Sequence, residues 1–299
     1  FGNAVLWKPS PAGAGVAEAL AALLPEGLVG LVHGDGSTAR HVALHVDALT
    51  VTGSPAAGWA LQEAAASRSI PFQAELGGNN GAIVWDGADL EAAAAAVADA
   101  AFAFAGQRCT ATRRAILPGA LHDRFTRLVA DAAARLPWGD PLEAATRVGP
   151  LVSVQARHDV AALLERCGAD VRAVAGEPPG PAYLAPAVVV GADPGSEIVR
   201  EETFGPVLVL QRARSFDEAL ELLDGVPQGL AAAMFGGAED ERARFLREAR
   251  AGILALDAAS PEVDVTLPFG GWKASGAGPS EHGEADADFF ARRQAIYRG

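Results

Sequence analysis

The sequence predicts an α/β protein with parallel sheets. Short apolar segments typical of strands alternate along the chain with amphipathic or alanine-rich segments typical of helices. Several apolar segments end in glycine, as expected where a strand turns into a crossover helix. Half of the 299 residues are apolar, which is enough for one large core or two ordinary ones.

The order of the elements follows from their periodicity. The predicted strands are residues 3–8, 27–34, 46–54, 70–78, 81–87, 206–213, 229–236 and 252–257. The predicted helices are residues 10–24, 55–67, 88–106, 121–136, 153–168, 215–223 and 238–250. Ser10, which precedes Pro11, and Ser54 are the candidate N-caps of the first two helices. Glycines cluster at 77–81, which indicates a boundary.

Charge and cysteine content limit the function. A net charge of −13 argues against nucleic acid or an anionic membrane as a partner, because both attract basic patches. Two cysteines cannot form a disulfide framework, which favours a reducing cytoplasm. The sequence has no signal peptide and no apolar run long enough to cross a bilayer. Of the 24 basic residues only Lys8 and Lys273 are lysines. Since the chain otherwise uses arginine, we expect these two positions to require an ammonium group.

Two residues are candidates for catalysis. Cys109 follows the longest predicted helix and is either a packed apolar side chain or a nucleophile. Arg108 beside it could favour the thiolate, although sequence neighbours on a helix do not face each other. Glu75 ends an apolar strand, where α/β proteins place their sites, and is either a general base or an ordinary exposed carboxylate. Cys167, at a helix end, is interpreted as structural.

Two strand-to-helix turns could bind an anion. Gly53 and Ser54 place backbone N–H groups at a helix N-terminus, and Gly34 and Gly36 do the same earlier in the chain. Neither turn has a dinucleotide-binding or Walker motif, so ordinary turn geometry also explains both. The segments REETFGPV and LPFGGWKASGAG are sharp turns that are structural when each is considered alone.

Taken together, seven segments resemble the NAD(P)-dependent aldehyde dehydrogenase superfamily. LWKPS, VTGS, ELGGNN, GQRCTA, WGDP, EETFGPV and PFGGWKASG occur in that family's order, and the spacing from Glu75 to Cys109 also matches. The resemblance runs from about residue 4 to residue 298. The ELGGNN and GQRCTATRR variants are similar to the branch that oxidises amino-acid-derived semialdehydes, including succinylglutamate semialdehyde.

The resemblance implies how the two candidates would act on a small-molecule aldehyde. Cys109 would attack the carbonyl to give a thiohemiacetal, and its backbone N–H would form half of the oxyanion hole. After hydride passes to NAD or NADP, water activated by Glu75 would hydrolyse the thioester to a carboxylic acid. The two glycines after Glu75 are expected to leave its side chain free to move.

The resemblance also implies a cofactor site without a metal. Lys8 resembles the ligand of the adenosine ribose, and Ser54 with its helix matches the pyrophosphate site. Glu202 resembles the ligand of the nicotinamide ribose, and Phe204 the residue beside the nicotinamide. Where NAD-preferring members often carry a glutamate, Pro11 stands here, so NADP should be tolerated. The complete predicted cofactor set is Lys8, Ser10, Gly34, Gly53, Ser54, Leu76, Glu202 and Phe204.

The same resemblance implies the domain organisation. Residues 1–77 would be the remaining part of a Rossmann-like NAD(P)-binding domain, and residues 78–277 an α/β catalytic domain. Residues 278–299 would be a tail whose strand crosses to a partner in a homodimer or homotetramer. The family's upstream segment, which supplies the second oxyanion donor, is absent here. About a third of a full-length enzyme is therefore expected to be missing.

Substrate and function retain alternatives. Asp257, Glu262 and Asp264 precede the PFGG segment and would favour neutral or cationic aldehydes, unless they point to solvent. The chain could also be an incomplete or inactive member that binds cofactor or aids assembly. A third reading is a cofactor-independent thiol esterase. Such an enzyme normally pairs its thiol with a histidine, and none of the six histidines lies in a local motif with Cys109.

Overall fold

The computed structural model describes residues 1–174, 176, 178–259 and 263–299. The chain divides into two compact units. The first unit comprises Phe1–Leu76, Val263–Gly270 and Gly276–Gly299, and the second comprises Gly77–Glu262 and Gly271–Ser275. Two stretches late in the chain therefore belong to the first unit, and the chain passes from one unit to the other directly after Leu76.

The second unit is built on a seven-stranded sheet. Its strand order is β12–β11–β5–β6–β9–β8–β7, and every neighbouring pair is parallel except β7 with β8. The predicted α/β fold with parallel sheets is thus confirmed. The strands are β5 (Asn80–Val84), β6 (Thr112–Pro118), β7 (Asp170–Ala173), β8 (Ala187–Val190), β9 (Val207–Ala213), β11 (Ala231–Phe235) and β12 (Ile253–Leu256).

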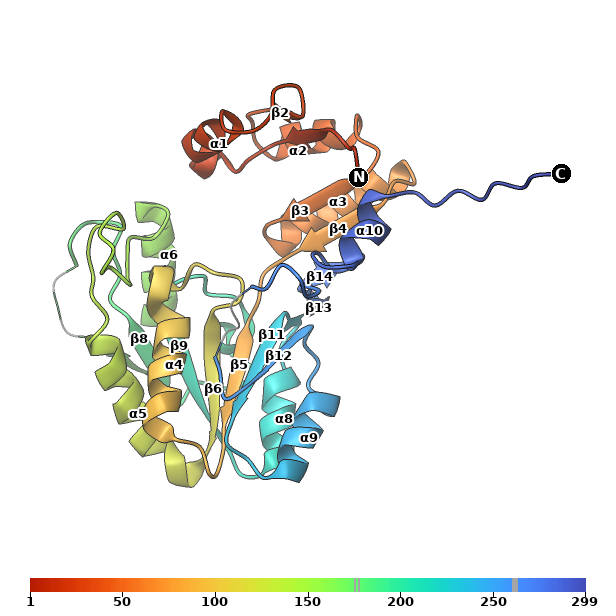
Figure 1. Cartoon of the computed structure of the whole chain (residues 1–299). Coiled ribbons are helices and arrows are strands. Elements are labelled where there is room, and N and C mark those ends of the chain that lie inside the picture. Colours follow the sequence, from red (N-terminus) through yellow and green to blue (C-terminus); the bar gives the residue numbers. More distant parts are fainter. Residues whose placement is uncertain (175, 177, 260–262) are drawn as a thin grey trace. The chain divides into compact units, whose positions relative to one another are not determined.

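Helices cover both faces of this sheet (Figure 1). Successive residues of a strand point to opposite faces, so Ala115 and Leu117 pack in one cluster and Ile116 in the other. On the first face lie α4 (Leu90–Phe102) and α5 (Gly119–Ala134). On the second lie α8 (Phe216–Asp224), α9 (Glu239–Glu248) and, towards β8 and β9, α6 (Val154–Arg166). The remaining short elements of the unit are η2 (Ala103–Gly106), α7 (Glu197–Arg200), β10 (Gln228–Gly229) and β13 (Trp272–Lys273).

The first unit contains two small sheets. In one, β4 lies between β3, which is parallel to it, and β14, which is antiparallel; in the other, β1 and β2 are parallel. The strands are β1 (Val5–Trp7), β2 (Val29–Leu31), β3 (Leu49–Thr52), β4 (Phe72–Glu75) and β14 (Gly276–Ala277). The helices are η1 (Pro11–Gly13), α1 (Ala14–Ala21), α2 (Gly36–Ala43), α3 (Pro55–Ser67) and α10 (Ala285–Phe290).

The prediction of Ser10 as an N-cap is wrong. The α-helix begins at Ala14 after a 3₁₀ turn, and the Ser10 side chain makes no capping hydrogen bond. Gly13 and Gly15 lower the helix propensity of the first turn, which favours the tighter 3₁₀ geometry there.

The first residues of the predicted C-terminal strand form a helix instead. Phe289 and Phe290 lie in α10, and their rings are 4.8 Å apart. Residues 291–299 form neither helix nor strand with the rest of this chain. A strand made with a partner remains a prediction. Within the described residues, no helix has the length and apolar character needed to cross a membrane.

Candidate active site

The loop that carries Cys109 begins with a strained turn. Phe104, Ala105 and Gly106 adopt left-handed conformations with φ of 56°, 53° and 68°, a region that non-glycine residues rarely occupy. A Cβ atom at Gly106 would collide with the carbonyl group of Gly205, so the position requires glycine. Cys109 lies half-buried in the loop that follows, as the sequence predicts, and its thiol is not part of a disulfide.

Asn80 connects this loop to the sheet. Its Nδ2 donates to the carbonyl oxygens of Cys109 and Ala111, both at 2.8 Å, and its Oδ1 accepts from the Ala231 amide at 2.9 Å. One buried side chain on β5 therefore holds the Cys109 loop on one side and β11 on the other. A Cβ atom at Gly78 would collide with the Cys109 carbonyl oxygen, so this glycine is needed for close approach.

Arg113 joins the Cys109 loop to the segment that carries Glu202. This β6 side chain is buried, and its guanidinium donates to the carbonyl oxygens of Gly106 and, at 2.5 Å, Gly205. Burial lowers the pKa of Arg113 to about 10, against the attraction of Glu202 and with a smaller contribution from Arg108. The group therefore remains charged at neutral pH.

Glu202 is directed at a backbone amide. Its Oε1 accepts from the Gly78 N–H at 3.0 Å, and a Cβ atom at Gly77 would collide with the same carboxylate. Burial raises the pKa of Glu202, opposed by the Gly78 bond and by Arg113. Phe204, two residues later, adopts a φ of 45° and is 43% exposed.

Glu75 ends β4 in the first unit. It is 4% exposed and lies opposite Thr52 of β3 and Gly276 of β14. Its carbonyl oxygen accepts from the Gly53 amide at 3.0 Å, so two predicted site residues are joined where β3 and β4 end. Leu76 is buried against α3, where a Cβ atom at Gly58 would collide with it or come very close to it.

Two helix N-termini of the first unit, those of α2 and α3, differ in the charge of their caps. The Asp35 carboxylate caps α2, accepting from the amides of Ser37 at 2.8 Å and Thr38 at 3.4 Å. The Ser37 hydroxyl and these amides lower the pKa of Asp35. The hydroxyl of Ser54 caps α3 and accepts from the Ala57 amide at 3.3 Å, as predicted. A pyrophosphate fits α3 better, because its cap is neutral.

Lys8 lies beside the α2 turn. Its Nζ donates to the carbonyl oxygens of Pro9 at 2.7 Å and Gly34 at 3.0 Å. Two predicted cofactor residues, Lys8 and Gly34, are thus in contact. An ammonium group after one strand and a neutral helix N-terminus after another suit a ribose and a pyrophosphate, so the residues present fit a dinucleotide.

The acidic segment before PFGG is already engaged where the structure describes it. Asp257 pairs with Arg242 at 2.7 Å and accepts from the Gly236 amide, and Asp264 accepts from the amide and hydroxyl of Thr266. The pKa of Asp257 is lowered, chiefly by the bond to Arg242. Glu262 lies outside the described residues. Only Asp257 is paired with a cation, so among the described residues the expected preference for neutral or cationic aldehydes rests on Asp264 and stays a prediction.

The predicted site residues form one set in each unit. Cys109, Glu202 and Phe204 belong to the second unit, and all the others belong to the first. The sequence analysis did not identify Asn80 or Arg113 as site residues. The doubled asparagine of ELGGNN was a usable signal for Asn80, because polar residues at the start of a buried strand need partners.

Comparison with known proteins identifies the class of fold and then the family. An NAD-dependent aldehyde dehydrogenase from Sinorhizobium meliloti, known as a crystal structure, superposes with a TM-score of 0.90 at 30% identity, covering 98% of this chain and 62% of that one. The model of the aldehyde dehydrogenase family matches residues 1–296. The chain belongs to the aldehyde dehydrogenase family.

Two curated relatives indicate the range of substrates in this group. The alpha-ketoglutaric semialdehyde dehydrogenase of Bacillus subtilis is 34% identical over 99% of this chain and 64% of its own length. The sulfoacetaldehyde dehydrogenase of Neptuniibacter caesariensis is 33% identical over 93% of this chain and 62% of its own length. The chain therefore spans less than two thirds of the length of these relatives.

Proposed function

We propose that the chain oxidises an aldehyde to a carboxylic acid with NAD or NADP as hydride acceptor. Cys109 is the nucleophile and Glu75 the general base. The observation that carries the proposal is the Cys109 loop, whose thiol-bearing residue is held by Asn80 at its own carbonyl oxygen. Relatives named for semialdehydes and aldehydes, together with membership of the family, support the reaction class.

At Cys109 the thiolate attacks the aldehyde carbon, and a carbon–sulfur bond forms while negative charge develops on the oxygen. The backbone N–H of Cys109 donates to that oxygen. Since Asn80 ties down the carbonyl oxygens of Cys109 and Ala111, the loop does not have to reorganise as this charge develops.

The cofactor, when bound, supplies the hydride acceptor. Lys8 would hold the adenosine ribose, and the α3 N-terminus with Ser54 the pyrophosphate. Glu202 and Phe204 would hold the nicotinamide riboside. Since Pro11 offers no carboxylate to repel a 2′-phosphate, NADP is accepted as well as NAD. A Michaelis constant for NADP far above that for NAD would exclude this.

The second half of the reaction depends on Glu75. Its carboxylate takes a proton from a water molecule that attacks the thioester carbonyl, and the Cys109 sulfur leaves as the carboxylic acid forms. Cysteine suits both halves, because a thiolate attacks readily and also leaves readily.

The wider setting is also part of the proposal. The first unit binds the cofactor and the second carries the nucleophile. Residues 291–299 form a strand with a partner in a homodimer or homotetramer, which light scattering on the eluting protein would test. Two cysteines outside any disulfide fit a reducing cytoplasm.

The test is NAD(P)H production by the purified chain with a panel of aldehydes, beside Cys109→Ala and the matched Cys167→Ala. We expect Cys109→Ala to abolish turnover and Cys167→Ala to retain it. Turnover that survives in Cys109→Ala would refute the assigned nucleophile. Ester hydrolysis that needs Cys109 but no cofactor would replace the proposal by a thiol esterase.

A further inference from the structure

The chain contains two arginine–cysteine pairs whose charges are balanced differently. Arg166, before Cys167, pairs with Glu197 through Nη2–Oε1 at 2.7 Å and Nε–Oε2 at 3.2 Å. Arg108, before Cys109, has no carboxylate within ion-pairing distance among the residues that the structure describes. The pair at the proposed nucleophile therefore carries an unbalanced positive charge, and the other pair does not.

The guanidinium of Arg108 is supported by an aromatic ring. Its Cζ lies 5.3 Å from the centre of the Phe104 ring, and the left-handed turn at Phe104 leaves that ring 62% exposed. A guanidinium stacked by its face keeps its in-plane N–H groups available for a carboxylate. The Arg108 Nε is buried and has no hydrogen-bond partner in the described part of the chain.

The charges nearby also favour an anion. Arg113 is the other cation, close enough for Arg108 to disfavour its charged form, and Glu202 is the carboxylate that acts on Arg113. Glu202 is itself hydrogen-bonded to the Gly78 amide, and no ion pair joins it to Arg108 among the described residues. A partly buried cation without a counter-charge costs free energy that an anionic ligand would offset.

We infer that Arg108 binds a carboxylate carried by the substrate, so that the aldehyde oxidised here is an anionic semialdehyde. That the bound anion is a substrate rests on the proposed function. The preference for an anion beside Cys109 can be tested without any turnover. The ion pair with Arg242 balances the charge of Asp257, which would otherwise oppose such a substrate.

The first experiment compares alkylation of the two cysteines by iodoacetate and iodoacetamide, followed by peptide mass spectrometry. Both reagents consume the same thiolate and release iodide, so their rate ratio cancels any change in thiol pKa. At Cys109, Arg108→Gln should lower the iodoacetate-to-iodoacetamide ratio by about three- to tenfold, as expected for one charge at short range. Arg108→Lys should retain most of the preference.

The second pair supplies the matched control. Arg166→Gln should leave the ratio at Cys167 unchanged, because Glu197 already balances that arginine. In the wild-type protein, high salt should lower the iodoacetate-to-iodoacetamide ratio at Cys109 towards the ratio at Cys167. This measurement does not depend on the folding of any variant. Equal ratios at the two cysteines in wild-type protein at low salt would overturn the inference.

The last arm compares turnover of succinate semialdehyde and butanal, which share a four-carbon chain. Arg108→Gln should raise the Michaelis constant about tenfold for the first and leave the second nearly unchanged. No turnover of either aldehyde, with the alkylation preference intact, would refute the proposed function and leave the anion site standing. Turnover with equal losses for both aldehydes would refute the role of Arg108 alone.

Discussion

Ser275 donates a hydrogen bond from its hydroxyl to the carbonyl oxygen of Gly77 at 2.7 Å. The same hydroxyl accepts from the Gly229 amide at 2.9 Å. The peptide group that joins Gly77 to Gly78 is also bonded at its other end, because the Gly78 N–H donates to Glu202. One peptide group is therefore held at both polar ends. Gly77 and Gly78 also allow close approach of Glu202 and of the Cys109 carbonyl oxygen, while the expected freedom of the Glu75 side chain to move stays a prediction.

Ser275→Ala should slow the second half of the proposed reaction more than the first, because peptide 77–78 lies just beyond Glu75. We expect steady-state turnover to fall at least about fivefold while the initial burst of NAD(P)H keeps its amplitude. Leaving Gly77 and Gly229 without their partner should also cost about 1–3 kcal/mol of unfolding free energy. Stopped-flow absorbance and urea denaturation measure the two effects.

Thr126→Ala is the control for the loss of a buried hydroxyl. Thr126 donates to the His122 carbonyl oxygen within α5, a helix that carries none of the predicted site residues. It should reduce stability without altering the ratio of burst to turnover. Equal slowing of both phases in Ser275→Ala would contradict a role in positioning.

Glu202→Gln should separate folding from cofactor binding. Because burial raises the pKa of Glu202, its charged form costs folding free energy at pH 7, and an amide keeps the acceptor for the Gly78 N–H. We expect the urea midpoint to stay the same or rise, while NAD binds about tenfold more weakly. A midpoint lowered as much as in Glu202→Ala would show that the charge itself is structural.

The two lysines should prove different. Lys273 Nζ donates to the carbonyl oxygens of Asp224 at 3.1 Å and Val226 at 2.8 Å, at the C-terminus of α8. Lys273→Met should therefore cost about 1–3 kcal/mol of stability. Lys8→Met should weaken cofactor binding with a smaller loss of stability. Urea denaturation and NAD titration of both variants measure these effects. A loss of stability in Lys8→Met with a loss of NAD binding in Lys273→Met would contradict the assignment.

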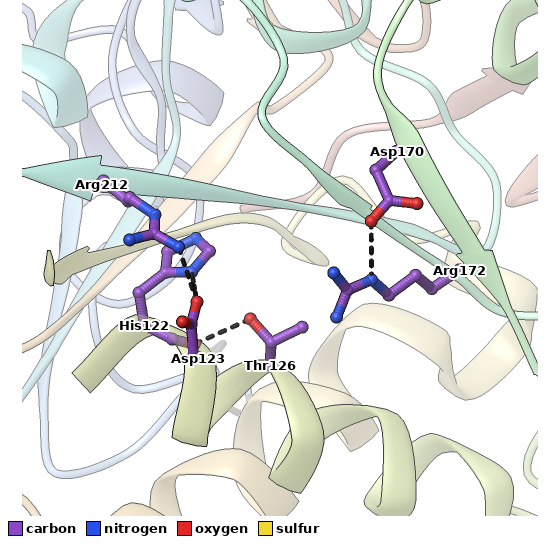
Figure 2. Close-up of polar contacts among 6 residues, drawn as sticks. All are labelled: His122, Asp123, Thr126, Asp170, Arg172 and Arg212. Carbon is purple, nitrogen blue, oxygen red and sulfur yellow. Dashed lines mark hydrogen bonds and ion pairs between the residues drawn. The ribbon is translucent and has the colours of Figure 1, made fainter. Parts of the chain in front are cut away.

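Stability should fall as the pH drops below neutrality, in part through His122. The Asp123 Oδ1 contacts both the His122 Nδ1, at 3.3 Å, and the Arg212 Nη2, at 2.6 Å; Figure 2 shows the three side chains together. Burial lowers the pKa of His122, so the unfolded chain binds more protons and stability is lost as the pH falls through 6.5. His122→Gln should flatten the urea midpoint between pH 7 and 5.5. An unchanged slope would contradict this.

Asp123 extends that dependence to lower pH. His122 and Arg212 lower its pKa, so its contribution is present above the ordinary aspartate range and is lost as the pH falls through the lowered value.

The fold followed from periodicity wherever strands were plainly apolar. The sequence analysis missed β6, because Arg113 and Arg114 interrupt its apolar pattern. Both arginines are buried and donate to carbonyl oxygens; Arg114, for example, donates to those of Leu222, Leu223 and Asn79. A pattern rule cannot foresee that loops and a helix C-terminus will supply those acceptors. It also missed β7 and β8, and β7 is a short edge strand.

The site was predictable by residue type but not by its supports. Cys109 and Glu75 stand out as reactive groups at a loop and a strand end. Ser275 acts on a carbonyl oxygen 198 residues away and Asn80 on one 29 residues away. Since backbone acceptors look the same at every residue, only the tertiary structure identifies which side chains bind them.

The amide of Asn80 also governs how this protein ages. Asn80 is followed by Gly81, a pair that cyclises and deamidates readily in flexible chains. In β5 the backbone is extended and the amide nitrogen is bonded to two carbonyl oxygens, so the reaction must wait for local unfolding. Once it occurs, a carboxylate would face those oxygens and release the Cys109 loop. Chemical damage at one strand residue would then remove activity while leaving the thiol itself intact.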